Sequence, residues 1–162
     1  MKIMGLDAST KITGYGIIQN NELIKHGIID LHNDKNTIDN RIKKMINSIY
    51  DLIKEEKPDV IYIEEMWNKL NVQTTKSLSY VIGAVIGFSE IMNIDIHLIL
   101  PSEWRKQIGL SQGKKKRDEL KQEAINFVKQ KYGLNVQDDE AEGIGICYCG
   151  YLLSEDTSAL FE

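Results

Sequence analysis

Hydrophobic residues follow two different spacings along the chain, and these spacings predict its secondary structure. Alternating or short continuous apolar runs predict strands, whereas apolar residues spaced by three and four predict amphipathic helices. Strands are therefore expected at residues 2–8, 13–19, 22–31, 59–64 and 95–100. Helices are expected at 36–56, at 72–92 and from near Asp138 onward. A further helix is expected to contain Leu120 to Val128 and to end at Tyr132-Gly133.

The order of these elements predicts an α/β fold. The first three strands are joined by short turns and form an antiparallel meander. The run DVIYIE at 59–64 is apolar and rich in β-branched residues, which is typical of a strand buried on both faces. Because the later strands alternate with helices, we expect a mixed sheet covered by helices, with functional residues in the loops at strand ends.

Composition adds limits to this picture. The 162 residues are 42% hydrophobic and 27% charged, as in an ordinary globular protein, and this length predicts a single domain over 1–162. No apolar run approaches the roughly 18 residues that span a membrane. The chain starts without the apolar segment of a signal peptide, and its two cysteines are one residue apart, so a reducing, cytoplasmic compartment is expected.

Charge is divided unevenly along the chain, although the net charge is only −4. Residues 105–117 (RKQIGLSQGKKKR) contain six basic and no acidic side chains, whereas 138–142 reads DDEAE. We expect 105–117 to be a loop that grips a polyanion, and the acidic segment to bind cations. The alternative is that both are solvated surface clusters.

Four carboxylates occupy positions where sites are built. Asp7 and Glu64 each lie at the exit of a predicted strand, and Asp139 and Glu142 lie three apart in the first turn of the last helix. If strands 2–8 and 59–64 are neighbours, the four can converge, and such a cluster is costly unless a cation neutralises it. Oxygen ligands suit Mg²⁺ or Mn²⁺, and two such ions about 4 Å apart support phosphodiester cleavage.

Simpler explanations exist for some of these acids. An aspartate at a helix start is often a cap or a partner of the helix dipole, which accounts for Asp139 without any metal. Glu64, followed by Glu65, is also compatible with the solvated end of a strand. Asp7 is harder to explain in this way, because a carboxylate following a buried strand needs a partner.

Four motifs resemble those of the RuvC family of Holliday-junction resolvases, within the ribonuclease H-like superfamily. They are GLDAS with TGYG at 5–16, VIYIEEMW at 60–67, SYVIGAVIGFSEI at 79–91, and DDEAEGIGICYC at 138–149. The match covers essentially the whole chain in the right order. Three departures stand out: Glu142 replaces an aspartate, Ile86 replaces the usual arginine, and Gly143 and Gly145 loosen a helix that is usually rich in alanine.

The resemblance implies a five-stranded mixed sheet and a homodimer that nicks paired strands of four-way junctions, forks or flaps. It implies two Mg²⁺ ions per active site, replaceable by Mn²⁺, and no small-molecule cofactor. The implied catalytic acids and metal ligands are Asp7, Glu64, Asp139 and Glu142. The short chain and its Lys, Ile and Asn content look like a phage member, which would act in the cytoplasm of a bacterial host.

DNA contacts are expected from an aromatic residue and from basic residues. Trp67 follows the predicted metal ligand Glu64 into a polar loop, where an exposed ring can stack on bases. Solvated lysines are the alternative for the basic positions, and the glycines of helix 72–92 suit either a dimer interface or packing on the sheet. The expected contacts are Trp67, Lys69, Lys76, Arg105, Lys106, Lys114, Lys115, Lys116 and Arg117, with Lys116 or Arg117 nearest the scissile phosphate.

Two other functions remain open at this point. The opening GLDASTKITG also resembles the first phosphate loop of actin-like ATPases, but those folds need a second glycine-rich hairpin and more than twice this length. A non-catalytic branched-DNA-binding module would use the basic stretch alone. It would not require acids at all four family positions, which favours the nuclease.

Overall fold

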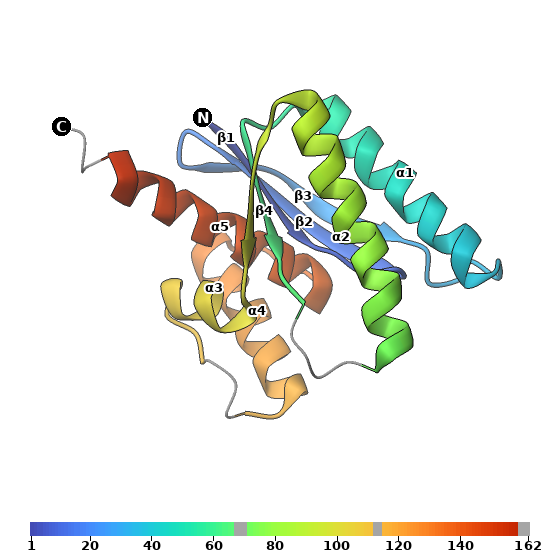
Figure 1. The fold of residues 1–162 in the computed structure, drawn as a ribbon. Coiled ribbons are helices and arrows are strands. Elements are labelled where there is room, and N and C mark those ends of the chain that lie inside the picture. The colour runs from blue at the N-terminus through green and yellow to red at the C-terminus, as the bar shows by residue number, and fades with distance from the viewer. Residues whose placement is uncertain (67–70, 112–114, 159–162) are drawn as a thin grey trace.

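The computed structural model describes residues 1–66, 71–111 and 115–158, and its centre is a five-stranded sheet (Figure 1). The spatial order is β3-β2-β1-β4-β5. β1 pairs antiparallel with β2 and β2 with β3, whereas β4 runs parallel to both β1 and β5. The expected mixed sheet is therefore confirmed. The strands are β1 (Lys2–Asp7), β2 (Ile12–Gln19), β3 (Glu22–Asp30), β4 (Val60–Glu64) and β5 (Asp95–Ile99).

Helices cover both faces of the sheet. α1 and α2 lie on one face, and α3, α4 and α5 lie on the other (Figure 1). None of the helices in the described ranges has the length and apolar character needed to cross a bilayer. Their bounds are α1 (Ile38–Glu56), α2 (Val72–Met92), α3 (Pro101–Gln107), α4 (Arg117–Tyr132) and α5 (Asp138–Ser158).

The prediction that 105–117 is entirely loop is wrong, because α3 extends to Gln107. Pro101 begins this helix, where its fixed φ suits the first turn. Glu103 reinforces the start by accepting a hydrogen bond of 3.0 Å from the backbone N–H of Leu100. The first two basic residues of the stretch, Arg105 and Lys106, consequently belong to a helix rather than to a loop.

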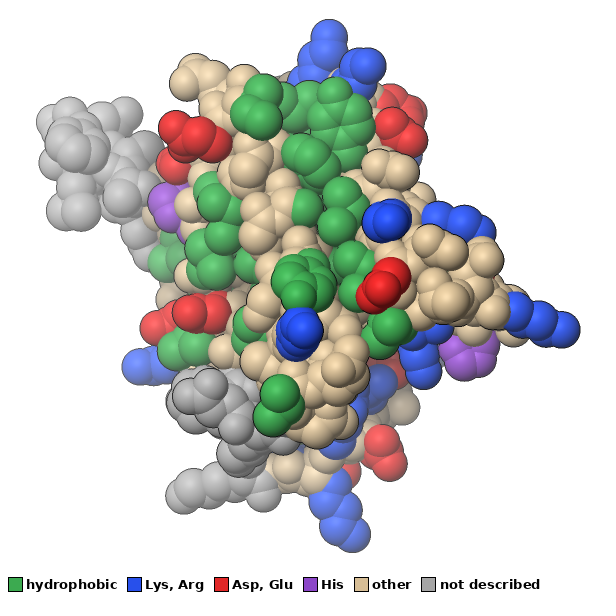
Figure 2. Space-filling model, turned by 45° about the vertical axis from the view of Figure 1, so that its right-hand side comes forward, with side chains coloured by type: hydrophobic (Ala, Val, Ile, Leu, Met, Phe, Trp, Pro, Cys, Tyr) green, Lys and Arg blue, Asp and Glu red, His purple; other side chains and the backbone are tan. Residues whose placement is uncertain are grey.

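The outward face of α2 has no partner within the described chain. Added Cβ atoms at Gly83 and Gly87 would meet no described atom within 4 Å, so these glycines do not serve close packing on the sheet. Tyr80, Ile86 and Ile91 are exposed on the same helix, by 51%, 39% and 84%. Figure 2 turns the α1 and α2 side toward the viewer and shows hydrophobic side chains exposed along its middle.

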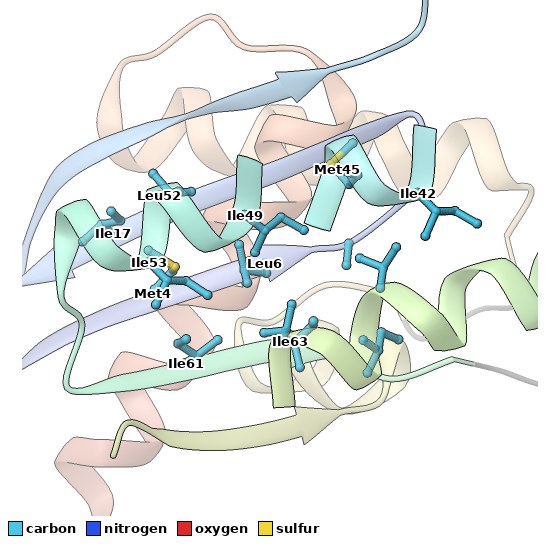
Figure 3. Packing of buried hydrophobic residues seen from close by; sticks show 14 residues of the cluster. Met4, Leu6, Ile17, Ile42, Met45, Ile49, Leu52, Ile53, Ile61 and Ile63 are labelled. Carbon is cyan, nitrogen blue, oxygen red and sulfur yellow. The ribbon is translucent and has the colours of Figure 1, made fainter. Parts of the chain in front are cut away.

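The larger core lies between the sheet and the helices α1 and α2 (Figure 3). Alternate residues of a strand point to opposite faces, so Met4 and Leu6 of β1 enter this core together with Ile61 and Ile63 of β4. The residues that alternate with these, including Asp7 after Leu6 and Glu64 after Ile63, therefore belong to the opposite face. On the helical side, the core is completed by residues spaced by three and four, namely Ile42, Met45, Ile49, Leu52 and Ile53.

On the opposite face, α5 lies directly against β1 and β2 through glycines. A Cβ at Gly5 would sit 2.2 Å from the backbone nitrogen of Cys147, and one at Gly143 would sit 2.5 Å from the carbonyl carbon of Gly14. Gly143 therefore lets the helix and strand backbones touch, which corrects the expectation that it merely loosens the helix. This contact fixes the first turns of α5 beside the end of β1.

Candidate active site

Asp7 and Glu64 come together at the ends of two neighbouring parallel strands. Leu6 of β1 pairs with Ile63 of β4, so the next residues of the two strands, Asp7 and Glu64, lie side by side at the same edge of the sheet. Both alternate with residues of the larger core and thus belong to the face that α5 covers. The predicted adjacency of strands 2–8 and 59–64 is confirmed.

The third and fourth acids reach this place through α5. Asp7 pairs with Gly14 across β1 and β2, and a Cβ at Gly14 would lie 1.7 Å from the carbonyl oxygen of Asp139. The backbone of Asp139 therefore rests on the residue opposite Asp7. Glu142 follows three positions later, close to one helical turn further along α5.

Asp7 lies in a buried and acidic environment. Its pKa is raised well above its ordinary value, first by burial and then by the negative charges of Glu64, Glu142 and Asp139. Lys121 of α4 acts in the opposite direction. Within the described chain, no side chain donates a hydrogen bond or forms an ion pair with the Asp7 carboxylate. A group in this position needs a cation or a proton to balance its charge.

Glu64 has a hydrogen-bond donor that the sequence did not reveal. The indole Nε1 of Trp104, in α3, donates to Oε2 of Glu64 over 2.7 Å. The pKa of Glu64 is raised to about 7, mainly by burial and further by the charge of Glu142, although the hydrogen bond from Trp104 acts to lower it. The alternative of Glu64 as a solvated strand end does not agree with this environment.

Glu142 faces Arg105, which corrects the prediction that Arg105 contacts DNA. The Arg105 side chain is only 5% exposed, and its Nη1 lies 3.5 Å from Oε1 of Glu142. The guanidinium also donates to the backbone carbonyls of Ser111 and Leu120. Burial raises the pKa of Glu142, and the positive charge of Arg105 is the largest influence that lowers it. Arg105 is thus buried because carbonyls and a carboxylate replace its hydration.

Lys121 is a second, only partly buried cation beside the acids, also unforeseen from the sequence. Its Nζ forms an ion pair with Asp138, at the start of α5. Burial and then Asp138 raise the pKa of Asp139, which Lys121 opposes. Lys121 therefore ties α4 to the first turn of α5 and offsets charge at the acidic end of the sheet.

The donor set fits a hard divalent cation. All four acids offer carboxylate oxygens, the ligands that Mg²⁺ and Mn²⁺ prefer. A bound cation would also offset the negative charges of Glu64, Glu142 and Asp139 that raise the pKa of Asp7. Among the described residues, no three Asp, Glu, His or Cys side chains are already grouped closely enough to hold one ion. Trp104 and Arg105 hold Glu64 and Glu142 in the arrangement seen.

The other predicted DNA contacts divide into two groups. Lys76 in α2, Lys106 in α3, and Lys115, Lys116 and Arg117 at the start of α4 are all exposed. Arg117 acts on the pKa of Glu64, which places its charge near the acids, and Lys115 forms an ion pair of 2.5 Å with Glu123. Trp67, Lys69 and Lys114 lie outside the described residues.

The sequence contains one signal that points to Trp104. In PSEWRK, Pro101 marks a helix start, and Trp104 then falls three residues later on one face of that helix. An apolar ring at this spacing indicates a buried helix face. No local signal assigns Lys121 to Asp138, because the pair joins two different helices.

A five-stranded mixed sheet with helices on both faces is a ribonuclease H-like fold. The chain belongs to the RuvC family: the model of that family, described as crossover junction endodeoxyribonuclease RuvC, matches residues 3–147. RuvC of Carboxydothermus hydrogenoformans is 26% identical over 158 residues, covering 94% of this chain and 96% of the relative. RuvC of Pseudothermotoga lettingae is 28% identical over 153 residues, covering 92% and 93%.

Solved structures show the same fold at low sequence identity. The structure of Thermus thermophilus RuvC in complex with a Holliday junction substrate has a TM-score of 0.76 at 12% identity, covering 96% of this chain and 95% of that one. The Fowlpox virus Holliday junction resolvase has a TM-score of 0.65 at 19% identity, covering 95% and 99%. The predicted ribonuclease H-like fold is confirmed.

Proposed function

We propose that this chain is a metal-dependent endonuclease that nicks paired strands of Holliday junctions and related branched DNA during recombination or phage DNA processing. Membership of the RuvC family supports this function. The single structural observation that carries it is the position of Asp7, whose pKa is raised by burial and by three other family acids. The chain acts as one nuclease domain, in the cytoplasm.

Asp7, Glu64, Asp139 and Glu142 would hold two divalent ions, for which Mg²⁺ is our proposal and Mn²⁺ a substitute. Bound there, the ions would activate water and stabilise the leaving oxygen of the phosphodiester. Arg105 and Lys121 limit the repulsion among the acids when the ions are absent. Glu142 is one methylene longer than the family's aspartate. It would still supply a carboxylate oxygen to the ions, because Arg105 holds it at the site.

The exposed basic residues at the start of α4 would bind the DNA backbone. Lys115, Lys116 and Arg117 lie on the same side of the sheet as the acids, because α4 packs against α5 there (Figure 1). Arg117 is our candidate for the residue nearest the scissile phosphate, since its charge already reaches Glu64. A fixed positive charge at that place stabilises negative charge that develops during cleavage. Lys106 and Lys76 would extend the contact.

We also propose that the protein is a two-fold dimer through α2. Resolving a junction needs cuts in two strands, and each chain supplies one set of acids. The outward face of α2 supports this assignment, because it exposes Tyr80, Ile86 and Ile91 and its glycines leave room for close approach of another backbone. The second copy of the chain is the occupant that gives the symmetric pair of sites.

The experiment that tests the function compares labelled four-way, forked, flapped and linear duplex DNA with Mg²⁺, Mn²⁺ or EDTA. We expect symmetric nicks in four-way junctions with either ion, little cutting of linear duplex, and none in EDTA. Junction binding without cutting under every ionic condition would instead support the non-catalytic module. The actin-like alternative has lost its support, because the family model that matches residues 3–147 is that of RuvC.

A further inference from the structure

We infer that Trp104 is a positioning residue that fixes the Glu64 carboxylate, so that one oxygen is held by the indole and the other is presented to a metal ion. This inference rests on the proposed nuclease function and deepens it. Trp104 touches neither metal nor DNA in this role. It acts on the ion through the orientation of Glu64.

The hydrogen bond has a defined direction. The indole Nε1 can only donate, and it donates to Oε2 of Glu64 over 2.7 Å. Nothing else within the described chain donates to this carboxylate, so the second oxygen, Oε1, is left without a donor. A carboxylate held at one oxygen offers the other in a single orientation.

The indole ring itself is held rigidly. Trp104 is fully buried, in the core cluster that also contains Ile3, Val60 and Tyr62. A Cβ at Gly145 of α5 would lie 2.9 Å from Cζ3 of the ring, so α5 lies directly against one edge. The guanidinium of Arg105 lies 4.9 Å from the ring centroid. Burial and these neighbours hold the ring with its N–H toward Glu64.

Core packing alone does not account for this arrangement. A phenylalanine or leucine would also fill the cluster, whereas a buried indole brings an N–H that must find an acceptor. Here the acceptor is one of the four acids, reached from a residue 40 positions away in sequence. Partners that orient a metal-ligating carboxylate commonly change metal affinity by 10- to 100-fold.

The test measures Mn²⁺ binding in the absence of DNA, by the electron paramagnetic resonance signal of the free ion. All proteins carry Trp67→Phe, which leaves Trp104 as the only tryptophan of the chain. The first variant is Trp104→Phe. The second replaces Trp104 by benzothienylalanine, which keeps the bicyclic shape and lacks the N–H. Val60→Ala, in the same core cluster but away from the acids, is the control for lost packing.

We expect the Kd for Mn²⁺ to rise about 10- to 100-fold in both Trp104 variants and to change less than about twofold in Val60→Ala. Junction nicking by the benzothienylalanine protein should recover at high Mn²⁺ concentration. Equal Kd values in the parent and the benzothienylalanine protein would overturn the inference, as would an equal loss of affinity in Val60→Ala. If the parent protein itself bound no Mn²⁺, the proposed nuclease function would fail first, and this inference with it.

Discussion

Arg105 and Glu142 form an ion pair inside the protein, with Nη1 of the arginine 3.5 Å from Oε1 of the glutamate. The pair joins α3 to α5. Trp104, the residue before Arg105 in α3, donates the hydrogen bond to Glu64. Two consecutive residues of a short helix thus contact two of the four acids. α3 therefore supports the acidic site, although the sequence predicted loop for its last residues, 105–107.

The first prediction concerns the stability that Arg105 provides. Arg105→Ala leaves Glu142 without its partner and two backbone carbonyls without a donor, so we expect the free energy of unfolding to fall by about 3–5 kcal/mol. Urea unfolding measures this change. Lys106→Ala is the matched control, because its exposed side chain should cost less than about 0.5 kcal/mol. Equal losses in the two variants would show that the Arg105 pair contributes nothing specific.

The second prediction is an unusual pH dependence of the metal-free protein. Burial raises the pKa values of Asp7, Glu64 and Glu142 in the folded state, to about 7 for Glu64. The folded state then binds more protons than the unfolded state between the ordinary carboxyl pKa of about 4 and about 7, so stability is lost as pH rises through that window. We expect the Tm in EDTA to fall from pH 5 to pH 8 (roughly the window set by these pKa values).

Two further measurements connect this behaviour to the acids. Mg²⁺ should raise the Tm more at the alkaline end of the window than at the acidic end, because ionised carboxylates bind it. Asp7→Asn should raise the Tm in EDTA at the alkaline end, since it removes one buried charge. A Tm in EDTA that stays constant or increases across the window would contradict the arrangement of acids described here.

The third prediction concerns the basic residues before α4. Replacing Lys115 and Lys116 together by Gln should weaken binding to every DNA form and lower the slope of log affinity against log salt by up to about 0.9 per lost phosphate contact. Fluorescence anisotropy at several salt concentrations measures both effects. Lys43→Gln, an exposed lysine of α1 on the other face of the sheet, should leave the slope unchanged. An unaltered slope in the double variant would identify a merely solvated cluster.

The fourth prediction tests the dimer. Ile86→Glu places a charge on the outward face of α2, where burial against a second copy would make it costly. We expect light scattering to report a dimer for the parent protein and a monomer for this variant at micromolar concentration. Ile24→Glu is the control, because Ile24 is similarly exposed but lies on β3. A parent protein that is monomeric both alone and on DNA would refute the dimer.

The sequence predicted the sheet well because its signals are local. Alternating and continuous apolar runs distinguish the strands, and Asp7 and Glu64 could be placed at one edge once their strands were assumed adjacent. The position of Asp139 followed from the helix start. Each of these inferences needs only residues that are close in sequence, together with one assumption about strand order.

The supporting residues could not be predicted because their contacts are distant in sequence. Trp104 contacts Glu64, which is 40 positions away in sequence, and Arg105 of α3 contacts Glu142 of α5. From sequence, Arg105 is one more positive charge in a basic stretch, and only the carbonyls and the carboxylate that surround it in the fold explain its burial. Likewise, Gly143 is needed for the close contact of α5 with the backbone at Gly14, and this contact is visible only in the fold.

The most direct test of the central claim uses Asp7→Asn, which removes the charge of a buried acid that three other carboxylates surround and keeps its shape. Nicking and binding of one labelled four-way junction are measured side by side, with Mg²⁺ for nicking and Ca²⁺ or EDTA for binding. We expect nicking to be lost while the Kd for the junction changes less than about threefold, because phosphate contacts elsewhere supply most of the affinity. Cleavage by Asp7→Asn at the rate of the unaltered protein would contradict the assignment of these four acids as the metal-binding active site.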